Sequence, residues 1–463
     1  MKSNTIAAIA TPMTNSGIGI IRISGDEALD IIEKVFKPKK KDKKIKDVKT
    51  YTAHYGHVYD ESTLLDECIV LVMKGPHSYT AEDVVEINCH GGVVVMKKVL
   101  EAVFKAGATP AEPGEFTKRA FLNGRIDLSE AEAVMDLIQS KNEFAMSTSL
   151  KQLEGALGKK ITEIRKQIIH SVAFIESALD DPEHYSLDGF PEKLLEEDKK
   201  WITIAKEMLD SYDNGRIIAE GIRTCIVGKP NAGKSSFLNA LFGEERAIVT
   251  DIAGTTRDTL EESVTIDGIT LNIVDTAGIR DTEDKVESIG VERAKKEIES
   301  ADLILFLMDT SVQISEEDIE ILQRIRDKKK IILLNKSDKA TEESGFEQSA
   351  LKEYISEETP VISISAKYGD GIDNFIMELK NMMFHGRIDV NQEVYITNAR
   401  HKDALAKTYE SLECVERSIE AGMPEDFFTI DLMNAYEKLG LIIGESVEED
   451  LVNEIFSKFC TGK

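Results

Sequence analysis

Residues 228–235 read GKPNAGKS, which fits the phosphate-loop pattern G-x-x-x-x-G-K-[ST]. The apolar run TCIV precedes this loop and the helix-like run SSFLNALF follows it, as the pattern requires. In such a loop backbone N–H groups converge on phosphates, Lys234 reaches the β- and γ-phosphates, and the Ser235 hydroxyl binds Mg²⁺. The order of strand, loop and helix argues against a chance glycine loop and predicts an α/β nucleotide-binding domain.

Outward from this loop, strands alternate with helices over residues 217–383. The apolar runs are TCIVG, VTIDG, ITLNIVD, DLILFLMD, KIILLN and PVISIS. This alternation predicts a doubly wound, mostly parallel sheet. Asp267 and Gly268 predict one hairpin, which adds an antiparallel edge.

A second motif, NKSD at residues 335–338, indicates which base is bound. It follows a buried strand, so its side chains should emerge at the carboxyl end of the sheet, where doubly wound folds bind ligands. The Asp338 carboxylate can accept hydrogen bonds from N1–H and the 2-amino group of guanine, and adenine offers no such donor pair. With SAK at residues 365–367 completing the base pocket, the sequence predicts GTP rather than ATP.

Two further stretches have the positions of switch loops. TDIAGTTRD at residues 250–258 would supply Thr256 as a second Mg²⁺ ligand, and a plain polar loop is the alternative. The D-x-x-G motif from Asp275 to Gly278 would sense the γ-phosphate, but Ile279 follows it, where Ras-like proteins carry a water-orienting glutamine. The predicted GTP contacts are Asn231, Ala232, Gly233, Lys234, Ser235, Ser236, Thr250, Asp251, Ile252, Ala253, Gly254, Thr255, Thr256, Asp275, Thr276, Ala277, Gly278, Asn335, Lys336, Asp338, Ser365, Ala366 and Lys367.

The sequence on either side of this domain has a different pattern. Residues 1–120 mix strand and helix signals, whereas residues 121–216 and 384–463 are almost wholly helical. Ser129 and Glu132 fit a capping box at the start of one of these helices. We therefore predict a multidomain α/β protein in which a P-loop GTPase domain is inserted in an all-α helical domain, and an α+β domain precedes both.

Composition limits the possible partners and location. The 463 residues correspond to about three domains. A net charge of -27 disfavours nonspecific adhesion to nucleic acid, so an RNA partner would need a local basic patch or a helper protein. KPKKKDKKIKD at residues 37–47 holds seven lysines, and a solvated connecting loop is the preferred interpretation over a nucleic-acid contact.

Five widely spaced cysteines argue against a disulfide framework or a zinc site. Without a long apolar run or a basic leader, the chain is expected in the cytoplasm and away from membranes.

The combined motifs resemble one family, the MnmE (TrmE) tRNA modification GTPases, over nearly the whole chain. The match is carried by GKPNAGKSS, TDIAGTTRD, DTAGIRDTEDKVE, PGEFTKRAFLNGRIDL and the terminal IFSKFCTGK. The resemblance implies that GTP hydrolysis is stimulated by K⁺ when two G domains meet face to face. It also implies a homodimer held by the N-terminal domain.

The resemblance also suggests what replaces the missing glutamine. K⁺ would act where other GTPases use an arginine, held by the residues matching Asn231, Thr250, Ile252 and Thr255. The water-orienting glutamate of the family corresponds to Glu287, which would join Lys234 in catalysis; a solvated glutamate at a helix start is the alternative. Arg257 and Arg280 are rival sources of positive charge.

For the modification chemistry, the resemblance implies a substituent at carbon 5 of the wobble uridine, position 34, of certain tRNAs. A flavoprotein partner, MnmG, would take part in a hetero-oligomer, and tRNA would be bound directly or through that partner. The one-carbon unit would come from 5-formyltetrahydrofolate or a related tetrahydrofolate, held by residues matching Arg22, Glu86, Arg125 and Lys463. Without the resemblance, an ordinary surface ion-pair residue is the alternative for Arg22, Glu86 and Arg125. Cys460 is a candidate nucleophile, with a small core residue as the alternative. Relatives usually show TPPGRGGVG where this chain has TPMTNSGIG, and CIGK where it has CTGK.

Three functional classes compete. The first is a GTP hydrolase whose cycle drives tRNA wobble uridine modification. The second is a GTP-switched RNA or ribosome-assembly factor, which the acidic composition and the lack of a G-x-x-G RNA-reading module disfavour. The third is a scaffold that binds GTP without turnover, which the intact phosphate and Mg²⁺ ligands disfavour.

Overall fold

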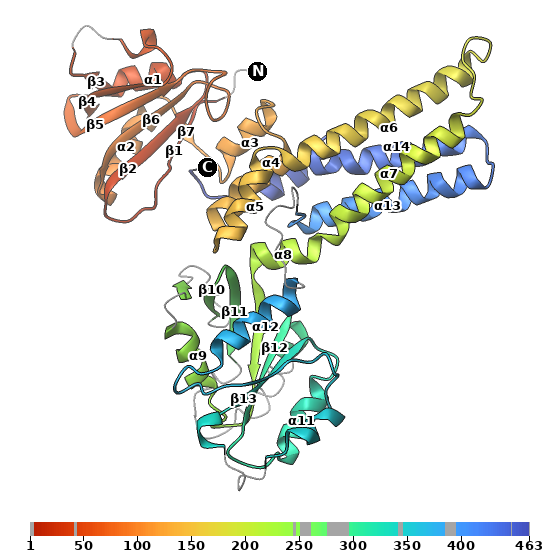
Figure 1. The fold of residues 1–463 in the computed structure, drawn as a ribbon. Helices are drawn as coiled ribbons and strands as arrows, with labels where there is room; N and C mark the ends of the chain where they lie inside the picture. The colour runs from red at the N-terminus through yellow and green to blue at the C-terminus, as the bar shows by residue number, and fades with distance from the viewer. Residues whose placement is uncertain are drawn as a thin grey trace. The chain divides into compact units, whose positions relative to one another are not determined.

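A computed structural model gives the fold, and it describes residues 4–40, 44–243, 247–250, 261–275, 296–340, 346–384, 395–445 and 447–462. The chain forms two compact units (Figure 1). The first unit comprises residues 1–138, 150–205 and 403–463, and the second comprises residues 139–149 and 206–402. In the described ranges, no helix combines the length and the apolar character needed to cross a bilayer.

The first unit begins with a seven-stranded, mostly antiparallel sheet in the order β3-β4-β5-β6-β2-β1-β7. Its strands are β1 (Ile6–Ile9), β2 (Ser16–Ser24), β3 (Phe36–Pro38), β4 (Thr52–Asp60), β5 (Thr63–Met73), β6 (Val84–Gly91) and β7 (Thr109–Pro110). Helices α1 (Ala28–Val35) and α2 (Val93–Lys105) pack on one face, and a short 3₁₀ helix covers Ile45–Asp47.

Strand alternation decides what each face of this sheet presents. Ile21 and Ile23 point into the core beneath the two helices and are completely buried. Because successive side chains alternate between faces, Arg22 lies on the opposite face. Strand β2 therefore presents the Arg22 guanidinium on the face of the sheet opposite α1 and α2.

The remaining helices of the first unit come from both ends of the chain. They are α3 (Glu115–Leu122), α4 (Leu128–Gln139), α6 (Ala156–Asp180), α14 (Glu425–Ile443) and α15 (Glu449–Ser457), together with parts of α5 (Glu143–Leu153), α7 (Phe190–Asp210) and α13 (Ala399–Glu420). Helix α6 packs along α14 (Figure 1), where the Arg165 Nε donates to the Tyr436 carbonyl at 3.1 Å. The two helical segments that flank the inserted domain thus pack together, as predicted.

The cap of α4 differs from the predicted one. Asp127, not Ser129, precedes the helix, and its carboxylate accepts from the Glu130 N–H at 2.8 Å. The Glu130 carboxylate in turn accepts from the Asp127 N–H at 2.8 Å. The Ser129–Glu132 capping box was therefore wrong by two residues, because an aspartate two residues earlier offers the same reciprocal pair.

The second unit contains the predicted doubly wound sheet, in the order β14-β13-β12-β8-β11-β10-β9. Its elements are α8 (Tyr212–Glu220), β8 (Ile222–Val227), α9 (Lys234–Gly243), β9 (Ala247–Thr250), β10 (Glu261–Ile266), β11 (Ile269–Asp275), β12 (Leu303–Asp309), α11 (Glu316–Arg324), β13 (Lys330–Asn335), β14 (Val361–Ser363) and α12 (Ile372–Phe384), with 3₁₀ turns at Ser337–Lys339 and Gln348–Glu353.

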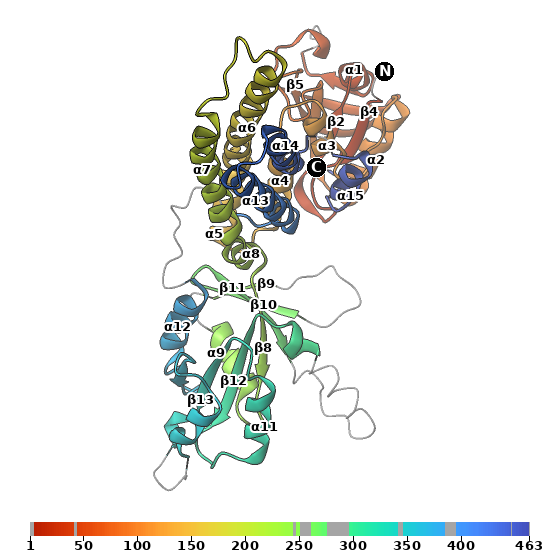
Figure 2. The same cartoon turned by 90° about the vertical axis from the view of Figure 1, so that its right-hand side faces the viewer.

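Both faces of this sheet are buried, as continuous apolar strands require. Helices α9 and α12 cover one face and α11 the other (Figure 2). The predicted hairpin is confirmed: β10 and β11 pair antiparallel around Asp267 and Gly268, whose φ angles of 49° and 83° suit a type I′ turn.

Candidate functional site

The phosphate loop lies between β8 and α9, and its backbone explains its composition. Gly233 has a φ of +98°, and a Cβ there would lie 2.1 Å from the Asn335 amide nitrogen. Gly228 has a φ of +153°, and a Cβ there would lie 2.5 Å from the Leu307 carbonyl. Asn231 adopts a left-handed φ of 64°, which asparagine tolerates better than most residues. The loop therefore needs glycine at both of its pattern positions.

Lys234 begins α9 and turns its ammonium group back over the loop. Its Nζ donates to the carbonyls of Gly228 at 2.6 Å and of Lys229 at 3.0 Å. Ser235 and Ser236 follow in the first turn of the same helix. The N-terminus of a helix carries partial positive charge, which together with Lys234 favours an anion at this point.

Asn335 joins three of the predicted motifs. It is 2% exposed, and its Nδ2 donates to the Ala232 carbonyl of the phosphate loop at 2.8 Å. Its Oδ1 accepts from the Ala366 N–H at 3.0 Å. The structure thus brings GKPNAGKS, NKSD and SAK together around one buried amide.

The base-recognition residues are held by neighbouring polar groups. Ser365 donates through its hydroxyl to the Asp338 Oδ1 at 2.7 Å. The Lys336 Nζ lies 2.5 Å from the Asp309 Oδ2 at the end of β12. Burial alone would raise the pKa of Asp309, but hydrogen bonds from Lys336 and Ser311 outweigh it and lower that pKa. The charged lysine and its carboxylate thus fix the start of the NKSD turn.

Lys367, the last residue of the SAK motif, is held by its neighbour in the sequence. Its Nζ contacts the Tyr368 hydroxyl at 2.9 Å, and that hydrogen bond raises the pKa of Lys367. Thr250 and Asp275 end β9 and β11, and Asp275 is registered beside Ile226, immediately before the phosphate loop. Residues 251–256 and 276–278 lie outside the described residues, as do Arg257, Arg280 and Glu287.

The one-carbon candidates meet on the outer face of the N-terminal sheet. Arg22 of β2 and Glu86 of β6 are directly paired, with the Arg22 Nη2 2.8 Å from the Glu86 Oε1. The two side chains are only 14% and 15% exposed, so they form a largely buried ion pair rather than an ordinary surface one. Arg22 and Arg125 both lie against the Tyr79 ring, 5.3 and 4.8 Å from its centroid.

The C-terminal segment reaches the same place. The Arg22 Nη1 donates to the Gly462 carbonyl at 3.2 Å, and the Cys460 carbonyl accepts from the Gly114 N–H at 3.2 Å. Cys460 is exposed and follows the end of α15, so its interpretation as a core residue was wrong. Lys463 lies outside the described residues.

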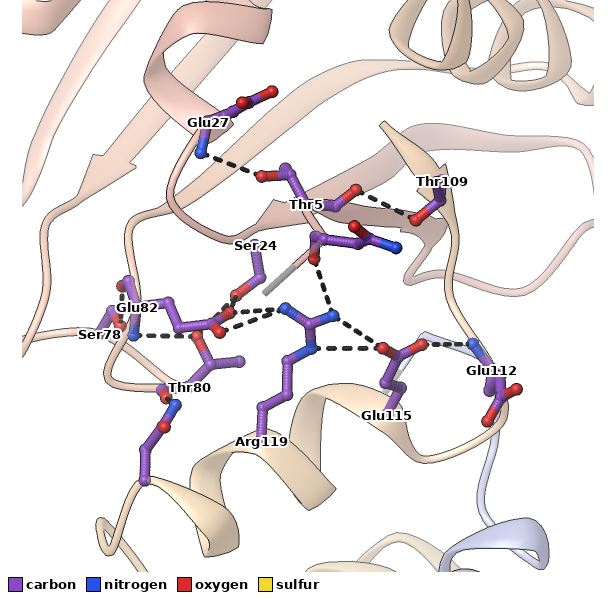
Figure 3. A network of polar contacts seen from close by, with 12 residues as sticks. Thr5, Ser24, Glu27, Ser78, Thr80, Glu82, Thr109, Glu112, Glu115 and Arg119 are labelled. Carbon is purple, nitrogen blue, oxygen red and sulfur yellow. Dashed lines mark hydrogen bonds and ion pairs between the residues drawn. The ribbon is translucent and has the colours of Figure 1, made fainter. Parts of the chain in front are cut away.

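Sequence reasoning missed a polar cluster beside this site. Arg119 of α3 lies between Glu82 and Glu115, at 3.1 Å and 2.8 Å, and Ser24 of β2 donates to Glu82 at 2.7 Å (Figure 3). The cluster fixes α3 to the sheet, and α3 carries Phe116, whose ring lies 5.6 Å from the Arg22 guanidinium. Only the repeated charges near Arg119 in the sequence could have suggested it.

Comparisons with known proteins agree over both units. The model of the MnmE helical domain matches residues 128–460, and the model of the GTP-binding protein TrmE N-terminus matches residues 5–125. A tRNA modification GTPase MnmE of Lachnoclostridium phytofermentans is 55% identical over 100% of both chains. The MnmE of Clostridioides difficile is 49% identical over 99% of both.

Among solved structures, a variant of Aquifex aeolicus Era bound to GDP and AlF4⁻ is 27% identical, covering 41% of this chain and 66% of that one. Its TM-score is 0.27, too low to carry an argument. Because the family models and the relatives span the chain, it belongs to the MnmE family of tRNA modification GTPases, GTP hydrolases that act in tRNA modification.

Proposed function

We propose that the chain is a potassium-stimulated GTPase that acts with an MnmG-type flavoprotein. Together they would install a (carboxymethyl)aminomethyl-type group at carbon 5 of uridine 34 in certain tRNAs, using a one-carbon tetrahydrofolate. The observation that carries the GTPase part is the Asn335 amide, which bridges the phosphate loop and the SAK loop at 2.8 and 3.0 Å. A base pocket and a phosphate pocket joined in this way fit a single guanine nucleotide.

The metal ions follow from the donor chemistry of this site. Hydroxyl, amide and carbonyl oxygens are the ligands that hard cations prefer. Ser235 and Thr256 would hold Mg²⁺, and Asn231 with Thr250, Ile252 and Thr255 would hold K⁺. The left-handed backbone at Asn231 supports this assignment, because Asn231 is the residue of this loop that adopts a positive φ without being a glycine. K⁺ supplies positive charge where the transition state gains negative charge, and Glu287 would orient the attacking water.

The folate assignment rests on the outer face of the N-terminal sheet. Arg22 and Arg125 would pair with folate carboxylates, Glu86 would bind a pterin edge, and Lys463 would reach the same site. Two aromatic rings beside these charges support a planar ligand. Exposure of Cys460 supports access to its thiol, which would be the nucleophile toward the uracil ring.

The proposed organisation has four segments: residues 1–120, 121–216, 217–383 and 384–463. The N-terminal segment would bind folate and form a cytoplasmic homodimer, and the G domains of the two copies would meet during hydrolysis. The partner and tRNA would join this dimer as a hetero-oligomer.

GTP turnover in K⁺ and in Na⁺ tests the central claim. We expect turnover many times faster in K⁺, and near loss of turnover in Glu287→Ala with GTP binding retained. Equal rates in the two salts would overturn the potassium claim. Mass spectrometry of tRNA nucleosides from a deletion strain separates the modification enzyme from a GTP-switched assembly factor, because only the former leaves uridine 34 unmodified when absent.

A further inference from the structure

One edge of the N-terminal sheet carries an unexpected set of side chains. The first two residues of the segment expected to be a connecting loop, Lys37 and Pro38, belong to strand β3, which pairs with β4 at the edge of the sheet. Lys37 and Lys39 from this edge lie over Tyr59 and Tyr55 of β4, and His57 lies between the two tyrosines. We call these five residues the lysine–aromatic strip.

The strip is built by strand register rather than by chance proximity. Lys37 pairs with His57, and the Lys39 N–H donates to the Tyr55 carbonyl at 3.1 Å. Ring centroids are 6.3 Å apart from Tyr55 to His57 and 6.5 Å apart from His57 to Tyr59, as expected for residues two apart on one strand. The Lys37 Nζ lies 4.3 Å from the Tyr59 ring centroid.

We propose that the lysine–aromatic strip is an RNA-binding surface through which this chain itself contacts tRNA. The proposal rests on the proposed function in tRNA modification. Aromatic side chains in neighbouring positions of a sheet stack unpaired bases, and lysines beside them neutralise phosphates. A strip that places lysines beside a row of aromatic rings in this way is suited to a single-stranded stretch such as an anticodon loop.

Charge favours a polyanion such as RNA over a basic or apolar protein partner. The chain has a net charge of -27, yet the described residues around β3 include exposed Lys37, Lys39, Lys40, Lys44, Lys46 and Lys49. A local basic patch of this kind is what an acidic protein needs to hold a polyanion. Tyr55 is 41% exposed, which leaves ring surface for a base.

The strip shares a sheet face with the one-carbon candidates. Ala53 pairs with Leu71, Leu71 with Glu86, and Glu86 with Arg22, so these four residues point to one side of the sheet. Tyr55 is two residues from Ala53 on the same strand and points to the same side. Strand β4 lies two strand spacings from β6, about 10 Å. A base bound at the strip would thus lie near Glu86.

Glu67 of β5 is the acidic neighbour of the strip. Its Oε2 lies 3.9 Å from the His57 Nε2, and a hydrogen bond to Glu67 raises the pKa of Tyr55. A carboxylate in this position repels phosphate. Removing the charge of Glu67 should therefore raise the affinity for RNA, whereas removing the charge of a lysine in the strip should lower it.

The test is a salt titration with the full chain and a labelled, transcribed tRNA that has uridine at position 34. We expect Lys37→Glu with Lys39→Glu to weaken binding at least about tenfold in ~0.1 M salt and to flatten the slope of log K against log salt by about 1.5. Tyr55→Ala should weaken binding roughly tenfold with little change of slope. Glu67→Gln should bind more tightly than the parent chain.

The matched control is Lys97→Glu with Lys98→Glu, which makes the same charge change on exposed positions of α2 in the same domain. Thermal unfolding checks that each variant is folded. If the strip and control variants bind alike, or if the parent chain does not bind, the proposal is wrong. It is equally wrong if Tyr55→Ala changes the oligomeric mass and leaves RNA affinity intact, because the strip is then a contact between two copies.

Failure of this proposal is distinguishable from failure of the proposed function. GTP turnover in K⁺ and Na⁺, measured on the same samples, tests the function without involving the strip. The RNA titration tests the strip whatever the turnover result. Complementation of a deletion strain adds a third readout: the lysine variants should leave uridine 34 of tRNA unmodified, and the control variant should restore its modification.

Discussion

The two seven-stranded sheets carry their functional groups in different places. In the mostly parallel sheet both faces are buried, and the nucleotide residues lie on loops at its carboxyl edge. In the mostly antiparallel sheet two helices cover one face, and Arg22 with Glu86 stand on the other face. The first arrangement presents backbone groups and turns, whereas the second presents side chains brought together by register. Substitutions should therefore have different consequences in the two regions.

The largest expected effect is on base recognition. Asp338→Asn replaces the carboxylate proposed to accept from the guanine N1–H and 2-amino groups with an amide and should lower GTP affinity at least about a hundredfold, because two donors then face each other. Affinity for xanthosine triphosphate should rise, since an amide can donate to its 2-carbonyl. Calorimetric titration measures both.

Asp373→Asn, at an exposed position of α12, is the control for this substitution. Stability of the N-terminal sheet should not change in either variant. If Asp338→Asn binds GTP as tightly as the parent chain, the claim that loop residues of the second unit recognise the base is wrong.

A second prediction concerns the paired side chains. Arg22→Met leaves the Glu86 carboxylate largely buried without its partner and should destabilise the sheet by about 3 kcal/mol. Adding Glu86→Leu should restore most of that loss, because an apolar pair of similar size removes the unpaired charge. Hydrogen exchange of the β2 and β6 amides measures the effect locally.

Lys105→Met is the matched control, because its ion pair with Asp60 is exposed and should contribute little. If the β2 and β6 amides exchange hydrogen at the same rate in Arg22→Met and in Lys105→Met, the buried pair of Arg22 and Glu86 does not stabilise this part of the sheet. Nucleotide affinity should stay constant throughout.

A third prediction is a pH response confined to the first unit. Asp198 of α7 is completely buried, and neither of its carboxylate oxygens has a hydrogen-bond partner among the described residues. Burial, and to a lesser extent Glu416, raise its pKa from 3.8 to about 8, and Lys199 opposes the rise. The folded state holds this proton more tightly than the unfolded state. The contribution to stability is therefore full below about pH 4 and is lost as the pH rises toward 8.

Asp198→Asn should flatten this dependence and raise the unfolding free energy by about 2 kcal/mol near pH 8. Denaturant unfolding followed by fluorescence of Trp201 measures it, because this buried residue is the only tryptophan and lies in the same helix. Asp180→Asn, at an exposed position of α6, is the control. If GTP affinity of the second unit changes with pH in the same way as this stability, the pH response is not confined to the first unit.

The smallest expected effect separates backbone strain from steric contact. Gly114 has a φ of +67°, and a Cβ there would lie 2.6 Å from the Phe456 carbonyl. Gly124 has a φ of +70°, but a Cβ at that position would meet no atom within 4 Å. Gly124→Ala should therefore cost about 1 kcal/mol from the left-handed backbone alone, and Gly114→Ala about 1 kcal/mol more. If the two variants lower the unfolding temperature equally, α15 moves away from the added Cβ of Gly114→Ala at no cost in free energy.

Much of the second unit could be predicted because its signals are contiguous. The phosphate loop, NKSD and the Asp267–Gly268 turn each occupy a few adjacent residues, and the residue types of each are typical of one backbone conformation. The outer face of the first sheet could not be assembled in this way. Tyr79 and Phe116 have no spacing that points to Arg22, and only strand register places them beside it.

Two local predictions differ from the structure for a related reason. The Ser129 cap was displaced because Asp127 offers a competing acceptor two residues earlier. The lysine-rich segment was expected to be a loop, and it departs from that only at its start, where Phe36, which is 2% exposed, draws Lys37 and Pro38 into β3. In both places a neighbour in the folded chain, not the local composition, decided the outcome.

The contact between Arg22 and the Gly462 carbonyl joins residues 440 positions apart. During synthesis Arg22 leaves the ribosome 440 residues before its partner. The outer face of the sheet thus lacks this contact while the whole nucleotide-binding domain is translated. A variant truncated just before Gly462 should still fold its G domain and hydrolyse GTP, yet it would lack this contact.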